Sequence, residues 1–454
     1  MNDTICAIAT AQGVGAIAII RVTGEDSKKI VNKIFKGKNL EEVKSHTINY
    51  GHIIDENNVV VDEVLVSVMD APRTYTAEDC VEINTHGGIA PTNKVLELLL
   101  ENGCRLAEPG EFTKRAFLNG RIDLLEAEAV MDMIEAKTDI QRSLAINQID
   151  GKVSNLINDI RNDMAQIIAN INVNIDYPEY DDVEIITNEL LIPKVSKLKE
   201  KIEKILNESK NGKIIKDGIN TAIVGRPNAG KSSLLNALLD EDKAIVTDIA
   251  GTTRDIVEGQ ISLNGIILNM IDTAGIRETE DIIESIGVEK SKKVIKESDL
   301  VLLVLNNNEE VTEDIKEIIK EIKKKNYLVL LNKIDLDNKI NLDKLDIDKD
   351  KIVKLSIINN EGIDDLKEKI IEMFNLSQIE KKDPTYLSNS RNISILKNCY
   401  KSIKDIEESL KNNQTLDIIE MDIQNIWSEL GKINGTTYEE ELLDEMFKRF
   451  CLGK

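Results

Sequence analysis

The sequence predicts a multidomain protein of the α/β plus α class, in which a doubly wound α/β domain is inserted into a helical domain. Three observations predict this. At 454 residues the chain is too long for a single hydrophobic core, which favours about two to four domains. Short apolar runs alternate with helical stretches in two separate regions. Elsewhere, apolar residues recur at helical spacing.

These changes of pattern set the predicted domain boundaries. Residues 1–118 form a mixed α/β domain, 119–212 the first part of the helical domain, 213–378 the inserted α/β domain and 379–454 the second helical part. We expect the two helical parts to pack together, because the ends of a domain often lie close in space. Within the first part, one long helix is expected from about Leu144 to Ile175.

The inserted domain contains six apolar strand candidates, at residues 221–224, 257–263, 266–271, 300–305, 327–331 and 352–355. Apolar strands that alternate with helices are typical of a doubly wound, mostly parallel sheet. The Asn264-Gly265 pair between the second and third candidates predicts a tight hairpin, because both residues tolerate a left-handed backbone. In the N-terminal domain, strands are expected near 15–22, 47–54, 59–69 and 81–85.

Composition excludes several classes of protein. The chain has 58 basic and 81 acidic residues and a formal charge of -23, so any RNA must be bound through local basic patches. The five cysteines have no C-x-x-C spacing, which fits a reducing, cytoplasmic environment without structural disulfides or zinc. No apolar run reaches the ~18 residues that a membrane-spanning helix needs, so no membrane association is expected.

A phosphate-binding loop is predicted at residues 225–232, which fit the pattern G-x-x-x-x-G-K-S between an apolar strand and a helix. In this motif, backbone N–H groups and the positive end of the helix surround the phosphates. Lys231 is expected to reach the β- and γ-phosphates, and the Ser232 hydroxyl to bind Mg²⁺.

Two motifs further along the chain are expected to contact the other parts of a nucleotide, namely the γ-phosphate with its Mg²⁺ and the base. Asp272, at a strand end, is expected to bind Mg²⁺ through water, and the Gly275 N–H is expected to sense the γ-phosphate. In Asn332-Lys333-Ile334-Asp335, the aspartate can accept hydrogen bonds from the guanine N1–H and amino group, whereas adenine presents the wrong pattern. Ser356 either supports the guanine ring or is an ordinary turn serine.

The residues that activate hydrolysis are less clear from spacing. Either Thr252 or Thr253 is expected to complete the Mg²⁺ shell. Ras-like GTPases carry a water-orienting glutamine directly after D-x-x-G, but this chain has Ile276 there. Glu284 and Glu278 follow in the same segment and are either its replacement or solvated carboxylates at the start of a helix.

Taken together, these motifs resemble those of the tRNA-modification GTPase family known as MnmE or TrmE, over essentially the whole chain. Two of the matching stretches lie outside the nucleotide motifs and separate this family from other GTPases: Phe117-Leu118-Asn119-Gly120-Arg121 and the terminal Cys451-Leu452-Gly453-Lys454. The others are residues 225–233, 244–255 and 272–275.

The resemblance implies a GTPase domain that dimerises across its nucleotide face, with K⁺ in the place of an arginine finger. It assigns K⁺ contacts to Asn228, Thr247, Ile249 and Thr252, and Mg²⁺ contacts to Ser232, Thr253 and Asp272. It makes Glu284 the residue that positions the attacking water, catalytic together with Lys231. The implied GTP-binding set is Asn228, Gly230, Lys231, Ser232, Ser233, Thr247, Thr253, Asp272, Gly275, Asn332, Lys333, Asp335 and Ser356.

The resemblance also implies that the N-terminal domain is folate-binding and forms a homodimer. Residues aligned with contacts to a tetrahydrofolate derivative are Arg21, Glu82, Arg121 and Lys454. Taken without the family, Arg21 and Glu82 read as ordinary surface charge. Cys451 lies in the family's C-terminal motif and is implied in the modification step, the alternative being a free surface thiol.

The implied activity is GTP hydrolysis coupled to a modification of tRNA. With the FAD-dependent MnmG protein, in a heterotetramer, the chain would add a carboxymethylaminomethyl or aminomethyl group at C5 of the wobble uridine, with folate supplying the carbon. The alternative is a regulatory GTPase switch of the ribosome-assembly type. The basic cluster Lys114, Arg115 and Arg121 is either a contact for tRNA or a solvated helix face.

Overall fold

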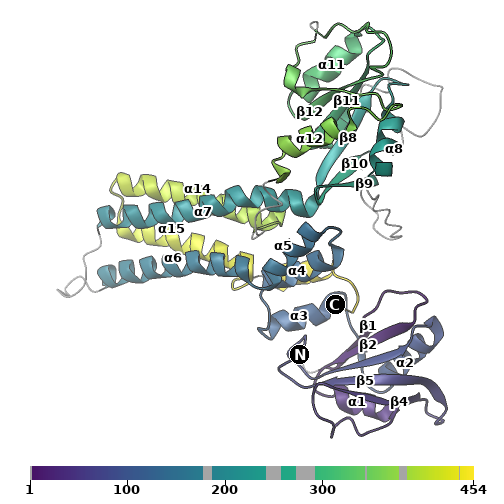
Figure 1. Ribbon diagram of the computed structural model, residues 1–454. Helices are drawn as coiled ribbons and strands as arrows, with labels where there is room; N and C mark the ends of the chain where they lie inside the picture. Colours follow the sequence, from purple (N-terminus) through teal and green to yellow (C-terminus); the bar gives the residue numbers. More distant parts are fainter. Residues whose placement is uncertain are drawn as a thin grey trace. The chain divides into compact units, whose positions relative to one another are not determined.

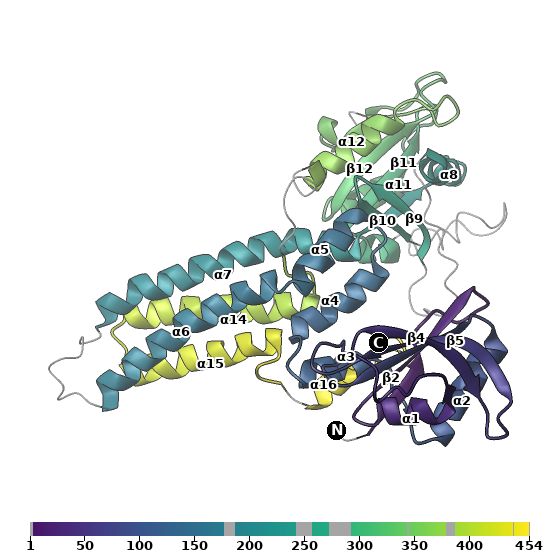
Figure 2. The same ribbon diagram turned by 60° about the horizontal axis from the view of Figure 1, so that its bottom comes forward.

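The computed structural model confirms the predicted fold class (Figures 1 and 2). It describes residues 3–176, 187–241, 257–271, 292–342, 345–377, 386–438 and 440–453. The chain divides into two compact units. One consists of Met1–Met131, Ile149–Lys194 and Asp405–Lys454, and the other of Asp132–Gln148 and Val195–Lys404.

The first unit contains a seven-stranded sheet in the order β3-β4-β5-β6-β2-β1-β7. Its strands are β1 (Ile5–Ile8), β2 (Ile17–Thr23), β3 (Phe35–Lys36), β4 (Thr47–Ile54), β5 (Val60–Met69), β6 (Cys80–His86) and β7 (Arg105–Leu106). All neighbours are antiparallel except β1 and β7. One face packs on α1 (Ser27–Ile34) and α2 (Ile89–Glu101) through a buried aliphatic core.

Besides α1 and α2, the first unit contains α3 (Glu111–Leu118), which lies at the end of the predicted N-terminal domain. Its other helices come from both predicted parts of the helical domain: α4 (Leu124–Glu135), which continues into the second unit, α6 (Lys152–Asp176), α15 (Leu416–Asn434) and α16 (Glu440–Phe447). The buried Arg161 of α6 donates from Nε to the Trp427 carbonyl oxygen of α15 at 3.3 Å. Its guanidinium lies 4.3 Å from the indole centroid. The two sequence-distant parts therefore pack together.

The expectation of one helix from Leu144 to Ile175 is wrong. Helix α5 (Asp139–Ile149) ends within this range, and a separate helix, α6, begins at Lys152. Gly151 separates them with a φ of 73°, in the left-handed region that glycine adopts without steric cost. A side chain at this position would contact the Glu126 carboxylate.

The second unit is built on a six-stranded sheet in the order β13-β12-β11-β8-β10-β9. The strands are β8 (Ile219–Gly225), β9 (Val257–Leu263), β10 (Ile266–Ile271), β11 (Leu300–Asn306), β12 (Asn326–Asn332) and β13 (Ile352–Lys354). Only β9 runs antiparallel to its neighbour. Asn264 and Gly265, both at positive φ, form the predicted hairpin between β9 and β10.

Helices cover both faces of this sheet. Alternate residues of β11 enter different cores: Leu302 packs with α8 (Lys231–Glu241) and α12 (Ile363–Met373), whereas Leu303 packs with α11 (Glu313–Ile322). The doubly wound, mostly parallel arrangement is therefore confirmed. The long helices α7 (Asn188–Asp217) and α14 (Ser390–Lys411) span both units. No helix among the described residues is long and apolar enough to cross a bilayer.

Candidate functional site

The predicted phosphate loop connects the end of β8 to the start of α8. Three of its residues have positive φ: Gly225 (156°), Asn228 (57°) and Gly230 (99°). At both glycines a Cβ would crowd atoms of another strand, the Val304 carbonyl oxygen of β11 for Gly225 and the Asn332 side chain of β12 for Gly230. The loop is thus a tight backbone turn that ends in a helix N-terminus, the geometry that suits an anion.

Lys231 lies at the centre of this turn. Its Nζ donates to the carbonyl oxygens of Gly225 at 3.0 Å and Arg226 at 2.7 Å. Burial lowers the pKa of the Lys231 ammonium. Ser232 and Ser233 follow in the first turn of α8, and both are exposed. The loop therefore brings an ammonium and a hydroxyl to the same helix end.

The predicted guanine loop is joined to the phosphate loop by two hydrogen bonds. The buried Asn332 donates from Nδ2 to the Ala229 carbonyl oxygen at 2.9 Å. Lys333 donates from Nζ to the Asn228 carbonyl oxygen at 3.1 Å. Both loops lie at the carboxyl ends of parallel strands, where α/β sheets bind their ligands.

Ser356 is fully buried, and its hydroxyl donates to Asp335 Oδ1 at 2.6 Å. This bond fixes the carboxylate of the exposed Asp335. Ser356, predicted either to support the guanine ring or to be an ordinary turn serine, contacts the carboxylate predicted to recognise guanine. Spacing alone cannot reveal this, because the two side chains come from different loops.

Several predicted site residues lie outside the described part of the chain. They are Thr247, Ile249, Thr252, Thr253, Asp272, Gly275, Ile276, Glu278, Glu284 and Lys454. Within the described ranges, no group of three or more His, Cys, Asp or Glu side chains is placed to hold a metal ion. Ser232 and Asn228 are the described members of the predicted Mg²⁺ and K⁺ sets.

A second polar cluster forms in the first unit around Tyr75. Arg21 Nε donates to Glu82 Oε1 at 2.9 Å, and Arg21 Nη1 donates to the Gly453 carbonyl oxygen at 3.4 Å. The Arg21 and Arg121 guanidinium carbons lie 5.3 Å and 5.1 Å from the Tyr75 ring centroid. The fold therefore brings together three of the four predicted folate residues and the C-terminal motif.

Sequence reasoning missed Tyr75. A tyrosine in the loop 70–79 carries no distinctive signal, and its position between two arginines depends on residues far away in the chain. Its hydroxyl lies 2.8 Å from Thr113 Oγ1, and Arg121 Nη1 donates to its carbonyl oxygen at 2.9 Å. In the C-terminal motif, Cys451 is exposed, and its carbonyl oxygen accepts a bond from the Gly110 N–H.

Arg115 fits neither of the two roles predicted for the basic cluster Lys114, Arg115 and Arg121, a contact for tRNA or a solvated helix face. That side chain is only 2% exposed and pairs with Asp3 at 2.7 Å, Glu111 at 3.1 Å and Glu78 at 3.2 Å. Lys114 pairs with Asp444. A solvated helix face or an RNA contact needs accessible charge, and Arg115 instead anchors the N-terminus and the loop that carries Tyr75.

Comparison with known proteins covers the whole chain. A family model described as MnmE helical domain matches residues 124–451, and one described as GTP-binding protein TrmE N-terminus matches residues 4–121. The tRNA modification GTPase MnmE of Ligilactobacillus salivarius is 53% identical, covering 100% of this chain and 98% of that protein. The protein of the same name from Bacillus cytotoxicus is 52% identical, with 100% and 99% covered.

Among solved structures, the G domain of the T. maritima FeoB iron transporter is similar to part of the chain. It is 27% identical and covers 34% of this chain and 97% of its own. The TM-score is 0.25, which is too low to support a comparison of the two folds.

Proposed function

The chain belongs to the MnmE (TrmE) family of tRNA modification GTPases, and from this membership we propose a specific reaction. Acting with the FAD-containing MnmG protein, it adds a carboxymethylaminomethyl or aminomethyl group at C5 of the wobble uridine of certain tRNAs. A tetrahydrofolate derivative supplies the carbon, and GTP hydrolysis drives a conformational step. The reaction takes place in the cytoplasm.

The observation that supports GTP as the nucleotide is the joining of the phosphate and guanine loops. Because Asn332 and Lys333 bond to the backbone at Ala229 and Asn228, the group that recognises the base is held at a fixed distance from the group that binds the phosphates. Asp335, oriented by Ser356, accepts hydrogen bonds from guanine, while Lys231 binds the β- and γ-phosphates.

The described residues fit the metal roles assigned to them. The exposed Ser232 hydroxyl at the start of α8 would hold Mg²⁺, together with Thr253 and Asp272. Mg²⁺ supplies charge neutralisation between the phosphates. Ser233, Thr247 and Gly275 complete the nucleotide contacts, and Glu284 positions the attacking water.

We also propose that K⁺ is bound by Asn228, Thr247, Ile249 and Thr252 across a dimer of GTPase domains. Asn228 is exposed, and its left-handed backbone holds it at the outer edge of the loop. GTP turnover should be fast in KCl and slow in NaCl at equal ionic strength. In the variant Asn228→Ala, the difference in turnover between KCl and NaCl should disappear. Equal turnover of the unaltered chain in the two salts would contradict the K⁺ mechanism.

The cluster around Tyr75 supports a folate site formed by Arg21, Glu82, Arg121 and Lys454. Two guanidinium groups suit the carboxylates of a folate glutamate tail, and the Glu82 carboxylate suits the N–H groups of a pterin. The exposed Cys451 lies in the same C-terminal motif and takes part in the modification step. The N-terminal domain, residues 1–118, is also proposed to form the homodimer. The other proposed domains are the helical domain, in two parts at 119–212 and 379–454, and the GTPase domain at 213–378.

Two measurements test this function. Titration of a reduced folate into the full chain should show saturable binding, whereas a ribosome-assembly switch predicts none. Mass spectrometry of wobble nucleosides in a strain lacking the gene should show loss of the C5 modification. Unchanged nucleosides would overturn the proposed reaction.

A further inference from the structure

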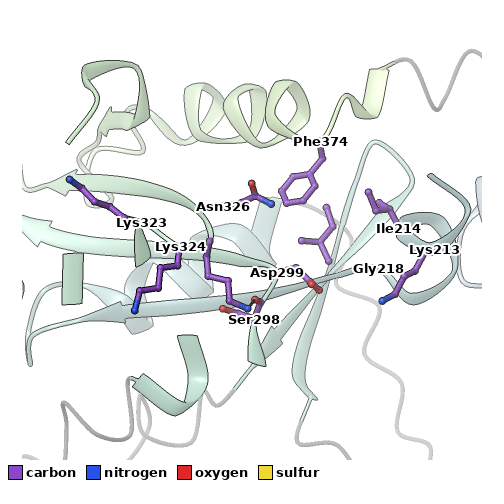
Figure 3. Close-up of a pocket in the computed structure, with 11 residues that line it drawn as sticks. Lys213, Ile214, Gly218, Ser298, Asp299, Lys323, Lys324, Asn326 and Phe374 are labelled. Carbon is purple, nitrogen blue, oxygen red and sulfur yellow. Dashed lines mark hydrogen bonds between the residues drawn. The ribbon is translucent and has the colours of Figure 1, made fainter. Parts of the chain in front are cut away.

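A cavity of about 510 Å³ lies at the opposite end of the second unit's sheet from the phosphate loop (Figure 3). Part of its lining lies where strands β8, β11 and β12 begin, and consists of Ile219, Asp299 and Asn326. The end of α7 contributes Lys213 and Ile214 to its wall. None of the proposed GTP or folate residues lines it.

The surroundings of this cavity are basic, although the whole chain carries a formal charge of -23. The three segments that contribute most of its lining, 213–218, 292–299 and 320–326, hold nine lysines and four acidic residues. Asp132, Glu317 and Asp346 pair with lysines of these segments and reduce the excess without cancelling it. A local positive field in an acidic protein is what binding of a polyanion requires.

The lysines on the rim can reach a ligand, and Lys323 can do so by exchanging its exposed partner Asp346 for a phosphate. Lys213 makes no ion pair with any residue that the structure describes, and it is exposed. Lys324 pairs with Glu321 at 3.0 Å, but its side chain is 70% exposed, so the pair contributes little and can exchange for a phosphate. Lys325 Nζ donates to the carbonyl oxygens of Lys296 and Ser298, which bind the ammonium without neutralising its charge.

One wall of the cavity is apolar. Phe374, at the end of α12, lies with Ile214 and Ile219 across from Lys323 and Lys324, and Figure 3 shows its ring directed toward the strand ends. An aromatic ring beside several ammonium groups suits a ligand that has both a planar base and a phosphate.

We propose that this lysine-rimmed cavity is a contact site for RNA, with backbone phosphates at the rim lysines Lys213, Lys323 and Lys324 and one unpaired base against Phe374. The inference rests on the proposed function in tRNA modification, and it identifies the part of an acidic protein that meets the acidic substrate. It places this contact away from the GTP-binding end of the domain.

The test compares two full-length variants with the same change in net charge. Lys213→Gln/Lys323→Gln/Lys324→Gln removes the rim, and Lys316→Gln/Lys339→Gln/Lys349→Gln removes three lysines of the same domain that do not line the cavity. Binding of unmodified tRNA is measured over a series of NaCl concentrations at fixed KCl. The rim variant should lose about tenfold or more in affinity and lower the salt slope by about 2, while the control stays near wild type.

A third variant, Phe374→Leu, keeps an apolar side chain and removes the stacking surface. It should weaken tRNA binding severalfold without changing the salt slope. GTP hydrolysis without tRNA should be unchanged in all three variants, which shows that the domain is folded.

The possible failures are distinguishable. Equal losses in rim and control variants, or no loss in either, would overturn the RNA contact while leaving the proposed function intact. A rim variant that loses binding of inorganic phosphate but not of tRNA would indicate a small phosphorylated ligand and also overturn it. If the unaltered chain binds no tRNA, both the contact and the role of the chain as a tRNA-binding partner fail.

Discussion

Lys333 Nζ donates a hydrogen bond to the Asn228 carbonyl oxygen at 3.1 Å, across 105 residues of sequence. One partner follows strand β12 and the other lies in the turn after β8. The bond joins the loop proposed to read the base to the loop proposed to hold the phosphates. The bond holds the two loops in a fixed relation, so the proposed base site and the proposed phosphate site are positioned together.

Asp335→Asn should exchange guanine specificity for xanthine specificity. In the proposed site the aspartate would accept hydrogen bonds from two guanine N–H groups, whereas an amide cannot accept both but can donate to the 2-oxo group of xanthine. GTP affinity should fall about 100-fold or more, because hydrogen bonds to a charged group are lost in a selective site. Calorimetry with GTP and XTP measures this. Asp337→Asn, an exposed neighbour, is the control and should bind GTP normally.

Gly230→Ala should abolish GTP binding. A Cβ there would overlap with the Asn332 amide, and the φ of 99° is unfavourable for alanine. Gly259→Ala provides the matched control, because a Cβ at Gly259 meets nothing closer than Leu239 at 3.7 Å. Nucleotide binding by both variants is compared in the same assay. Retained affinity in Gly230→Ala would show that the loop is not the phosphate site.

Glu111→Gln should lower the thermal stability of the chain by several degrees near neutral pH. Burial acts to raise the pKa of Glu111, but hydrogen bonds from Arg105, the Glu108 N–H and Arg115 outweigh it and hold that pKa below its usual value. The carboxylate therefore stabilises the fold above the unfolded pKa of about 4.3, and this contribution is lost as pH falls through the folded pKa.

The difference in melting temperature between wild type and Glu111→Gln should accordingly stay level from about pH 7 to about 5 and shrink as the pH is lowered further, below the unfolded pKa of about 4.3. Differential scanning calorimetry at a series of pH values measures it. Glu313→Gln, whose partner is an exposed lysine on the same helix, should change little at any pH. A difference for Glu111→Gln that is constant with pH would mean that the substitution acts through packing alone.

Tyr75→Leu should weaken binding of a reduced folate by about tenfold, because the ring lies against both Arg21 and Arg121 and holds their guanidinium groups in place. Tyr75→Phe keeps the ring and loses the hydroxyl contact with Thr113, so it should bind nearly normally. Arg73→Gln, an exposed arginine of the same loop, controls for charge. Isothermal titration calorimetry of the three variants decides between these outcomes.

Much of the nucleotide domain could be predicted because its signals are local. The strands at 257–263 and 266–271 have the bounds that their apolar runs indicated, and the Asn264-Gly265 turn between them depends only on the backbone preferences of two residues. The phosphate loop likewise needs glycines at fixed offsets and a helix after them.

What the sequence determined by itself was therefore the fold class, the helix and strand types and the nucleotide motifs, because neighbouring residues dictate them. Tertiary structure alone decided the burial of Arg115 and the meeting of Arg21 with Gly453 across 432 residues. Burial and long-range contact depend on how distant segments pack, and two residues that meet only in the fold leave no periodic pattern along the chain.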